Sequence, residues 1–145
     1  MKKIFILLIC FMFVFNSNGQ TKRIIYKDLP KMTKVFIDTF YPKRKAIYTF
    51  EGINRVREYE IYFPNGTKLE FDRYGKLKSI ECGKGEYINK DILPDEINDI
   101  IQQYYSSEKI VEYNIDDRST RYEEHEIEFE SGLEITVNGR LNNKY

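Results

Sequence analysis

The sequence has few of the residues from which metal centres and nucleophilic active sites are built. It contains one histidine, His125, and two cysteines, Cys10 and Cys82. It has no Gly-rich phosphate loop, no zinc-ligand spacing and no G-x-S-x-G nucleophile motif. Because no residues remain to which a reaction could be assigned, the sequence predicts a protein that is not an enzyme and uses no cofactor.

The sequence also lacks a surplus of positive charge. Lys and Arg together number 23, and Asp and Glu together also number 23. A nucleic-acid-binding surface needs clustered basic residues to neutralise phosphates. We therefore expect no nucleic acid among the partners of this protein.

Only one long hydrophobic run occurs, at residues 4–15. It is too short to cross a membrane, because a spanning helix needs about 20 apolar residues. Two lysines precede the run, and a short polar segment ending in Gly19 follows it. This order is typical of a secretory signal peptide, residues 1–19, cleaved before Gln20. We expect a periplasmic or secreted protein with no membrane span after cleavage.

The mature chain, residues 20–145, keeps a single thiol. Cys10 lies in the cleaved segment and is flanked by large residues, where a lipid-attachment site requires small ones. Cys82 has no second cysteine to pair with after cleavage, which excludes an internal disulfide, and we expect it to be a small buried residue. Stability must come from packing, and the 12 Tyr and 10 Phe of the sequence supply large apolar areas.

Charge is unevenly distributed along the mature chain. Residues 20–85 carry 15 basic and 8 acidic side chains, whereas residues 86–145 carry 6 basic and 15 acidic ones. Opposed fields of this kind can steer a partner, pair copies head to tail, or attract each other within one molecule. We favour the internal attraction.

The mature sequence is similar to itself. The Leu-Pro pair at 29–30 recurs 64 residues later, at 93–94, and the segment at 60–63 recurs 66 residues later, at 126–129. A two-residue insertion in a loop accounts for the change in offset. The similarity predicts a single domain made of two repeats, at about 28–85 and 92–145.

Each repeat is expected to open with an amphipathic helix, because its apolar residues recur at spacings of three and four. Pro30 and Pro94 fit the first turn of such helices, where a backbone N–H is not needed. The predicted buried stripes are Leu29, Met32, Val35, Phe36, Phe40 and Tyr41 in the first helix and Leu93, Ile97, Ile100, Ile101, Tyr104 and Tyr105 in the second.

An antiparallel meander is expected after each helix. Residues 57–63 alternate between apolar and polar, and Asn65-Gly66 predicts a type I′ turn into the next strand. The pattern returns at 122–129, and Asn138-Gly139 predicts a further turn. The predicted fold class is α+β, with two tandem helix-plus-antiparallel-meander repeats forming a sheet with helices on one face. The other face should stay open to water or to a partner.

These features together resemble the PepSY-like family of secreted bacterial proteins, which share a fold with the beta-lactamase inhibitor protein. The resemblance rests on the signal peptide, the repeated Leu-Pro helix segments and the sequence YEIYFPNGTKLEFDRYGKL at residues 59–77. It covers essentially the whole mature chain, although the second repeat has His125 in place of Tyr59 and Ser131 in place of Asn65. It implies an envelope or secreted location and a sheet face suited to binding protein, and it implies no chemistry.

The candidate binding residues lie on the open sheet face. Alternation along the strands places there Glu60, Tyr62, Glu70, Glu126 and Glu128. We expect them to contact a protein or peptide partner in the cell envelope. An alternative, implied by the resemblance, is an inhibitor of an extracellular hydrolase, either a protease or a beta-lactamase.

A further alternative is a calcium-responsive envelope protein, because the strand at 123–130 is rich in glutamate. Residues i and i+2 on a strand stand about 6–7 Å apart, however, which is wide for shared ligation of one ion. We expect this stripe to be solvated and to protect the sheet from aggregation. His125 shares a face with apolar neighbours, so we expect it at the rim of the core and not in a metal or catalytic site.

Overall fold

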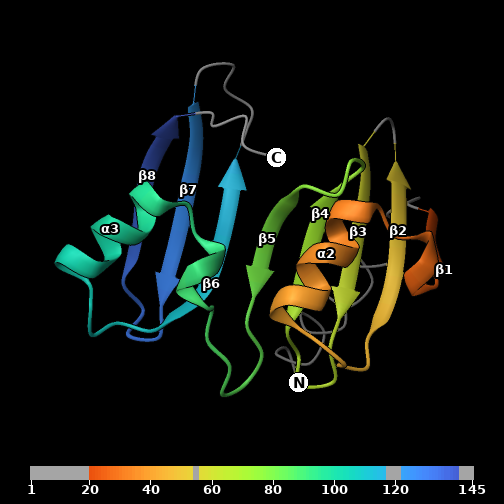
Figure 1. The fold of residues 1–145 in the computed structure, drawn as a ribbon, viewed down its shortest axis with the longest axis horizontal. Coiled ribbons are helices and arrows are strands. Elements are labelled where there is room, and N and C mark those ends of the chain that lie inside the picture. The colour runs from red at the N-terminus through yellow and green to blue at the C-terminus, as the bar shows by residue number, and fades with distance from the viewer. Residues whose placement is uncertain (1–19, 54–55, 117–121, 141–145) are drawn as a thin grey trace, which may run out of the picture.

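The computed structural model describes residues 20–53, 56–116 and 122–140. The predicted signal peptide, residues 1–19, lies outside the described residues. The described chain forms one antiparallel sheet of eight strands with two helices, which confirms the α+β class (Figure 1).

The strands follow one another across the sheet in the order of the sequence, and each neighbouring pair is antiparallel. The first strand was not predicted, because its sequence, QTKRI, does not alternate between apolar and polar; backbone pairing with the second strand defines it. The strands are β1 (Gln20–Ile24), β2 (Ile47–Ile53), β3 (Val56–Tyr62), β4 (Lys68–Asp72), β5 (Leu77–Glu81), β6 (Ile110–Asp116), β7 (Tyr122–Phe129) and β8 (Glu134–Arg140).

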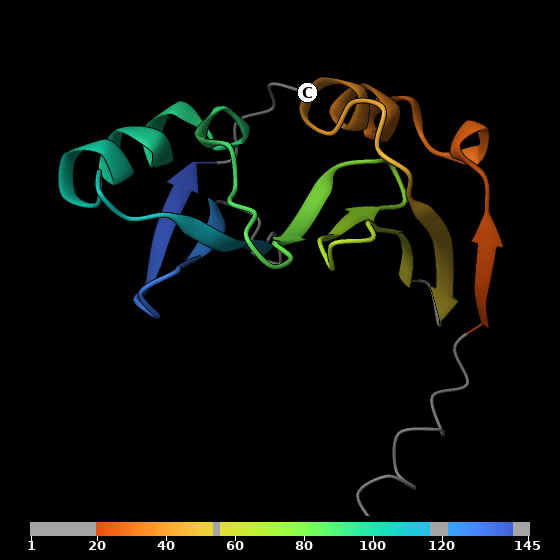
Figure 2. The ribbon, with the colours of Figure 1, turned by 90° about the horizontal axis from the view of Figure 1, so that it is seen from below.

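Both helices lie on the same face of the sheet. Helix α2 (Lys31–Phe40) lies over the first half and α3 (Asp95–Tyr104) over the second, as Figures 1 and 2 show. A short 3-10 turn precedes each helix, η1 (Tyr26–Asp28) before α2 and η2 (Lys90–Ile92) before α3. In residues 20–53, 56–116 and 122–140, no helix lies on the opposite face of the sheet, which leaves that face available for contact with other molecules.

The two helices begin and end alike. Pro30 and Pro94 precede the first helical residues, and their carbonyls accept the first intrahelical hydrogen bonds at 3.1 and 2.9 Å. Tyr41 and Tyr105 close the last turns, each through a backbone hydrogen bond of 2.8 Å. A duplicated unit would have this likeness, and the tandem repeat remains a prediction.

The core lies between the helices and the sheet, and it corrects the predicted helix stripes. Leu29, Tyr41 and Ile101 are buried as predicted, but Met32, Val35 and Tyr104 are 40%, 57% and 67% exposed, and Ile37, which the predicted stripe left out, is buried. The buried stripe is narrower than predicted because a helix lying flat on a sheet buries only the sector that faces it. The sheet side of the core is formed by Ile61, Leu69, Phe71, Ile80, Tyr113, Ile127 and Phe129.

Three hairpins use the same turn, and it is not the predicted type I′. In each, a glycine N–H donates to the carbonyl three residues earlier, and the glycine has a positive φ of 93° at Gly66, 90° at Gly75 and 81° at Gly132. A type I′ turn also needs a positive φ at Asn65, which has none. The prediction is wrong because Pro64, with φ fixed at about −65°, takes the first central position of a type I turn that a glycine bulge completes.

The predicted turn at Asn138-Gly139 is also wrong, because both residues lie within β8. A Cβ atom on Gly139 would lie 2.9 Å from Nε2 of the buried His125. The glycine therefore makes room for the imidazole of the neighbouring strand and does not turn the chain.

Candidate binding surface

The face of the sheet away from the helices is strongly acidic. Side chains alternate between the two faces along each strand, so a residue next to a buried one lies on this face; Glu60, next to the buried Ile61, is an example. Positive charge comes from Arg23, Lys68 and Lys78. The carboxylates of this open face are Glu51, Glu58, Glu60, Glu70, Asp72, Glu81, Glu112, Asp116, Glu124, Glu126, Glu128 and Glu134.

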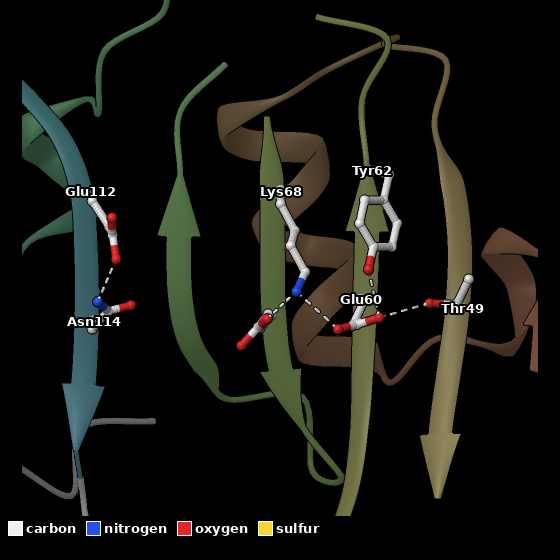
Figure 3. A network of polar contacts seen from close by, with 7 residues as sticks. Thr49, Glu60, Tyr62, Lys68, Glu112 and Asn114 are labelled. Atoms are coloured by element: carbon white, nitrogen blue, oxygen red, sulfur yellow. Dashed lines mark hydrogen bonds and ion pairs between the residues drawn. The ribbon is translucent and has the colours of Figure 1, made fainter. Parts of the chain in front are cut away.

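Glu60, on β3, is the centre of a hydrogen-bond network on the open face (Figure 3). Its carboxylate accepts a hydrogen bond from the Tyr62 hydroxyl at 2.7 Å and one from the Thr49 hydroxyl at 3.3 Å. Lys68 Nζ lies 3.0 Å from Glu60 Oε1 and also forms an ion pair with Glu70. Because the network joins β2, β3 and β4, its side chains are held in place before any partner binds.

This network is charged at neutral pH. Burial by itself would raise the pKa of Glu60, but hydrogen bonds from Tyr62, Lys68 and Thr49 outweigh it, and the pKa is lowered. Burial would likewise lower the pKa of Lys68, but Glu70 and Glu60 outweigh it, and the pKa is raised. Glu60 and Lys68 therefore stay ionised together across the physiological range.

A shallow pocket of about 340 Å³ on the open face spans the junction between the two halves of the sheet. Glu58 and Glu70 line it from β3 and β4, Lys78 from β5, and Asn114 and Glu126 from β6 and β7. Burial, followed by the Glu70 carboxylate, raises the pKa of Glu58. The pocket thus places carboxylates of β3, β4 and β7 around one hollow, with Lys78 among them.

Four glutamates stand side by side across the second half of the sheet. The register pairs Glu81 with Glu112, Glu112 with Glu128, and Glu128 with Glu134. Directly opposite side chains of antiparallel strands have Cβ atoms about 5 Å apart, and like charges at that spacing are destabilising. Partial desolvation, and then the neighbouring Glu112 and Glu134 carboxylates, raise the pKa of Glu128. A cationic partner would relieve the repulsion in this glutamate row.

All five predicted binding residues lie on the open face, and the structure brings some of them together. Glu60 and Tyr62 hydrogen-bond to each other, and Glu70 joins them through a shared lysine. Glu126 and Glu70 line the same pocket, whereas Glu128 lies in the glutamate row. Their role in binding remains a prediction.

Lys68 and Glu112 also belong to this surface, but they were not among the predicted binding residues. Lys68 bridges two of the predicted residues, and Glu112 contacts Asn114, whose amide donates a 2.8 Å hydrogen bond to it (Figure 3). The missing signal was register: alternation assigns each residue to a face, but only the pairing of β5 with β6 shows that the two halves share one row.

His125 was expected at the rim of the core, and it lies fully inside, with 2% of its surface exposed. Its ring stacks on Tyr113 with 5.8 Å between centroids, and its Nδ1 is 2.8 Å from the Tyr113 hydroxyl. Burial lowers the pKa of His125, with the Glu123 carboxylate opposing it, and burial raises the pKa of Tyr113. Both groups are therefore neutral at pH 7, and their contact is part of the packing.

Among the described residues, no group of three or more His, Cys, Asp or Glu side chains is arranged to hold a metal ion. Cys82 is half-buried, and burial, followed by the nearby Glu86, raises the pKa of its thiol to about 12. The thiol is protonated at neutral pH and is a poor nucleophile. His125 and Cys82 therefore contribute to packing in and around the core.

An antiparallel sheet covered by helices on one side, with an acidic uncovered side, defines the structural class of this molecule. Residues 57–142 match the family model described as "Putative beta-lactamase-inhibitor-like, PepSY-like". The chain belongs to this PepSY-like family, as the sequence motifs predicted. Among curated proteins, none matches the sequence.

Three solved structures resemble the fold. A putative periplasmic protein of the DUF2874 family from Bacteroides vulgatus ATCC 8482 is 26% identical, with a TM-score of 0.73 and coverage of 84% of this chain and 92% of that one. A putative calcium-regulated periplasmic protein from Bacteroides thetaiotaomicron is 23% identical, with a TM-score of 0.71 and coverage of 81% and 89%. A putative periplasmic protein of unknown function from Bacteroides vulgatus ATCC 8482 is 22% identical, with a TM-score of 0.68 and coverage of 86% and 98%.

The first of these neighbours is described as periplasmic, and the predicted periplasmic or secreted location is confirmed. At identities below 25%, the second and third neighbours support the fold alone. Within the described residues, no helix has both the length and the apolar character needed to cross a bilayer.

Proposed function

We propose that this protein is a non-enzymatic binding module that holds a basic segment of a protein or peptide against the open face of its sheet. The observation that carries the proposal is the excess of carboxylates on that face, around the ordered network of Glu60, Tyr62 and Lys68. A face of one sign attracts partners of the opposite sign and raises their rate of encounter.

The proposal also gives the glutamate row a role. Repulsion between Glu112 and Glu128 lowers the stability of the free protein, and a lysine or arginine from a partner would remove it. Tyr62, at 38% exposed, supplies an aromatic surface beside the carboxylates, and aromatic residues are enriched in interfaces. Charge and an ordered aromatic group therefore occur together on the same face.

We also infer that the module arose by duplication of one helix-and-meander unit, giving repeats at about 28–85 and 92–145. The matching proline and tyrosine positions at the ends of α2 and α3 support this inference. Each repeat would then contribute half of the open face, and the pocket lined by Glu70 and Glu126 would mark their junction.

The test uses a fluorescent ten-residue peptide of alternating Lys and Ser, with a Glu and Ser peptide as its counterpart. We expect the mature protein to bind the first and not the second in fluorescence anisotropy. The triple variant Glu60→Gln, Glu70→Gln, Glu126→Gln should bind about ten-fold more weakly, since each exposed ion pair contributes about 0.5 kcal/mol and 1.4 kcal/mol is a factor of ten. Raising the salt concentration should reduce the difference.

A matched control changes carboxylates on the other side of the molecule. Glu96 and Asp99 are exposed on α3, so Glu96→Gln, Asp99→Asn should leave the affinity unchanged. Equal losses in the two variants would mean that net charge, and not the open face, attracts the peptide. Retrieval of the same envelope proteins by wild type and by Tyr62→Ala, Glu126→Lys would also count against this face.

The description of the family favours a second candidate, an inhibitor of an extracellular hydrolase. Such an inhibitor would use the same face, with a beta-lactamase or protease as the partner. Panels of both enzyme classes at micromolar protein decide between the candidates, because inhibition that is lost in the open-face triple variant would support this one. Full enzyme activity across both panels would remove it.

A third candidate is calcium-dependent binding, because one structural neighbour is described as calcium-regulated. The described carboxylates form rows and not a cluster that encloses an ion. If calcium bound the native state, a concentration of 100 times its Kd would stabilise it by about 2.7 kcal/mol. A melting temperature that does not move in millimolar calcium would dismiss this candidate.

A further inference from the structure

A second pocket, of about 350 Å³, lies on the opposite side of the sheet from the acidic open face. Its lining residues are Phe50 from β2, Arg57 and Tyr59 from β3, and Arg73 and Tyr74 from the turn after β4. Strand alternation places Arg57 and Tyr59 on the same face as the buried core residues of β3, which is the helix side. This pocket is therefore separate from the proposed binding face.

The charge of the pocket is positive. Among the described residues that line it, the charged ones are the exposed Arg57 and Arg73, and none is a carboxylate. Among the described residues, neither Arg57 nor Arg73 forms an ion pair, whereas Arg44 and Lys76 each pair with a glutamate. In a chain with equal numbers of acidic and basic residues, two neighbouring guanidinium groups without a carboxylate leave room for an external anion.

Aromatic rings form the rest of the pocket and fix one of its arginines. The Arg73 guanidinium lies over the Tyr74 ring, 4.5 Å from its centroid, and donates a hydrogen bond to the Tyr74 hydroxyl. The rings of Phe50 and Tyr59 pack together with 5.1 Å between centroids. One arginine is thus held by a ring without being neutralised, next to an apolar wall on which a further ring can pack.

Gly52 keeps this pocket open on its β2 side. It pairs directly with Arg57, and a Cβ atom at this position would lie 3.3 Å from the Phe50 ring. A larger side chain here would stand between the arginine and the ring. The missing side chain therefore leaves a path along which a ligand can touch both at once.

We propose that this pocket binds an acidic peptide segment in which an aromatic side chain neighbours carboxylates. Arg57 and Arg73 receive the carboxylates through paired N–H···O hydrogen bonds, the geometry that guanidinium groups favour. Phe50 and Tyr59 pack against the aromatic ring of the peptide. The volume of about 350 Å³ lies at the small end of ligand pockets and suits one side chain and its neighbour.

The test titrates the mature protein with a fluorescein-labelled Glu-Asp-Phe-Glu-Asp peptide and follows anisotropy. We expect saturable binding that weakens about ten-fold in Arg57→Gln and in Arg73→Gln, because each variant removes a charge-assisted hydrogen bond to a carboxylate of the peptide. Arg23→Gln is the matched control, because Arg23 is an exposed arginine whose register with Thr49 places it on the open face. Its affinity for the peptide should not change.

Two further measurements keep the result independent of folding and of overall charge. Gly52→Leu, which fills the pocket without removing charge, should also weaken binding, while melting curves confirm that each variant is folded. Replacing Phe by Ala in the peptide should weaken binding, and replacing its acidic residues by Gln and Asn should abolish it. Free N-acetylphenylalanine binding as tightly as the peptide would identify a small aromatic carboxylate as the ligand and overturn the assignment to a peptide.

Equal loss in Arg23→Gln and Arg57→Gln, or no binding at millimolar peptide, would overturn the proposal. The lysine peptide of the open-face experiment provides the separation from the proposed function. It should bind Arg57→Gln and wild type equally, so failure of one site leaves the other unaffected.

Discussion

Gly139, on the edge strand β8, tests how tightly His125 is held in the core. Alanine at this position places a Cβ atom 2.9 Å from Nε2 and 3.2 Å from Cδ2 of the imidazole. The ring is 2% exposed and stacks on Tyr113, whose hydroxyl lies 2.8 Å from Nδ1, so a shift of the ring would disturb these buried contacts. Either the ring or the edge strand must therefore shift.

Two opposing effects set the size of the change in stability. Adding a methyl group to a packed core costs about 1–3 kcal/mol. Alanine in a strand is favoured over glycine by about 0.5–1 kcal/mol, which offsets part of that cost. We expect Gly139→Ala to lower the free energy of unfolding by about 1–2 kcal/mol and the melting temperature by about 4–8 °C, since 1 kcal/mol corresponds to about 4 °C at this size.

Urea and thermal denaturation, followed by circular dichroism, measure both quantities. Asn138→Ala is the adjacent control on β8; Asn138 is exposed, and its substitution should change stability by less than about 0.5 kcal/mol. The same glycine substitution in a His125→Ala background should cost nothing, because the atoms it would strike are gone. The pair should therefore be strongly non-additive.

The comparison of Gly139→Ala in the wild type and in His125→Ala can also contradict this explanation. An unchanged melting temperature in Gly139→Ala would show that the sheet edge yields freely. A cost of equal size with and without the imidazole would show that the glycine is required by the backbone and not by His125.

Three further outcomes follow from the buried groups and from the acidic row. Burial lowers the pKa of His125 below its unfolded value of about 6.5, so the stability that the neutral ring contributes to the folded protein is complete above pH 6.5 and is lost as pH falls through the folded-state pKa. Urea denaturation curves from pH 7.5 to 5 should show this loss of stability. The loss should be smaller in His125→Phe. Thr67, fully buried, donates to Glu86 and accepts from the Gly83 N–H at 2.9 Å, so Thr67→Val should cost about 1–3 kcal/mol in urea denaturation, whereas the exposed Thr136→Val should not. Glu112→Gln should raise the melting temperature by relieving repulsion within the glutamate row, and the gain should shrink in high salt.

Alternation predicted the hairpin strands β3 and β7 well because each has one buried face. Ile61 and Ile127 are 0% and 1% exposed, as the period of two requires, and the flanking Glu60 and Glu126 lie on the open face. The predicted α+β class depends on the same signal. The candidate binding residues were placed correctly on a face because that placement needs only local periodicity.

Features that depend on contacts between residues far apart in the sequence could not be predicted from alternation. The Asn138-Gly139 pair resembles a hairpin turn, but Gly139 is required by His125 on the neighbouring strand. β1 has no pattern of its own and exists because β2 offers it a pairing edge. The pocket shared by Glu70 and Glu126 likewise appears only when β5 pairs with β6.

The basic first half and the acidic second half of the mature sequence form ion pairs with each other. Arg44–Glu86 and Lys76–Glu123 are ion pairs between the halves, which agrees with the favoured internal attraction. Charge is also divided between the two sides of the sheet, since the carboxylates named above lie on the open face and the arginine pair of the second pocket lies on the helix side. A period of two along each strand is enough to produce this separation.

Separation by face predicts that the two proposed sites act independently. The sheet with its side chains is about 10 Å thick, so the two peptides contact different side chains, and salt at 0.1 M, with a Debye length of about 10 Å, weakens the attraction between charges on the two faces. The lysine peptide should therefore not displace the acidic peptide, and each should bind with the same Kd in the presence of a saturating amount of the other. Competition between them in an anisotropy titration would mean that both peptides contact a single surface, and the assignment of one site to each face would be wrong.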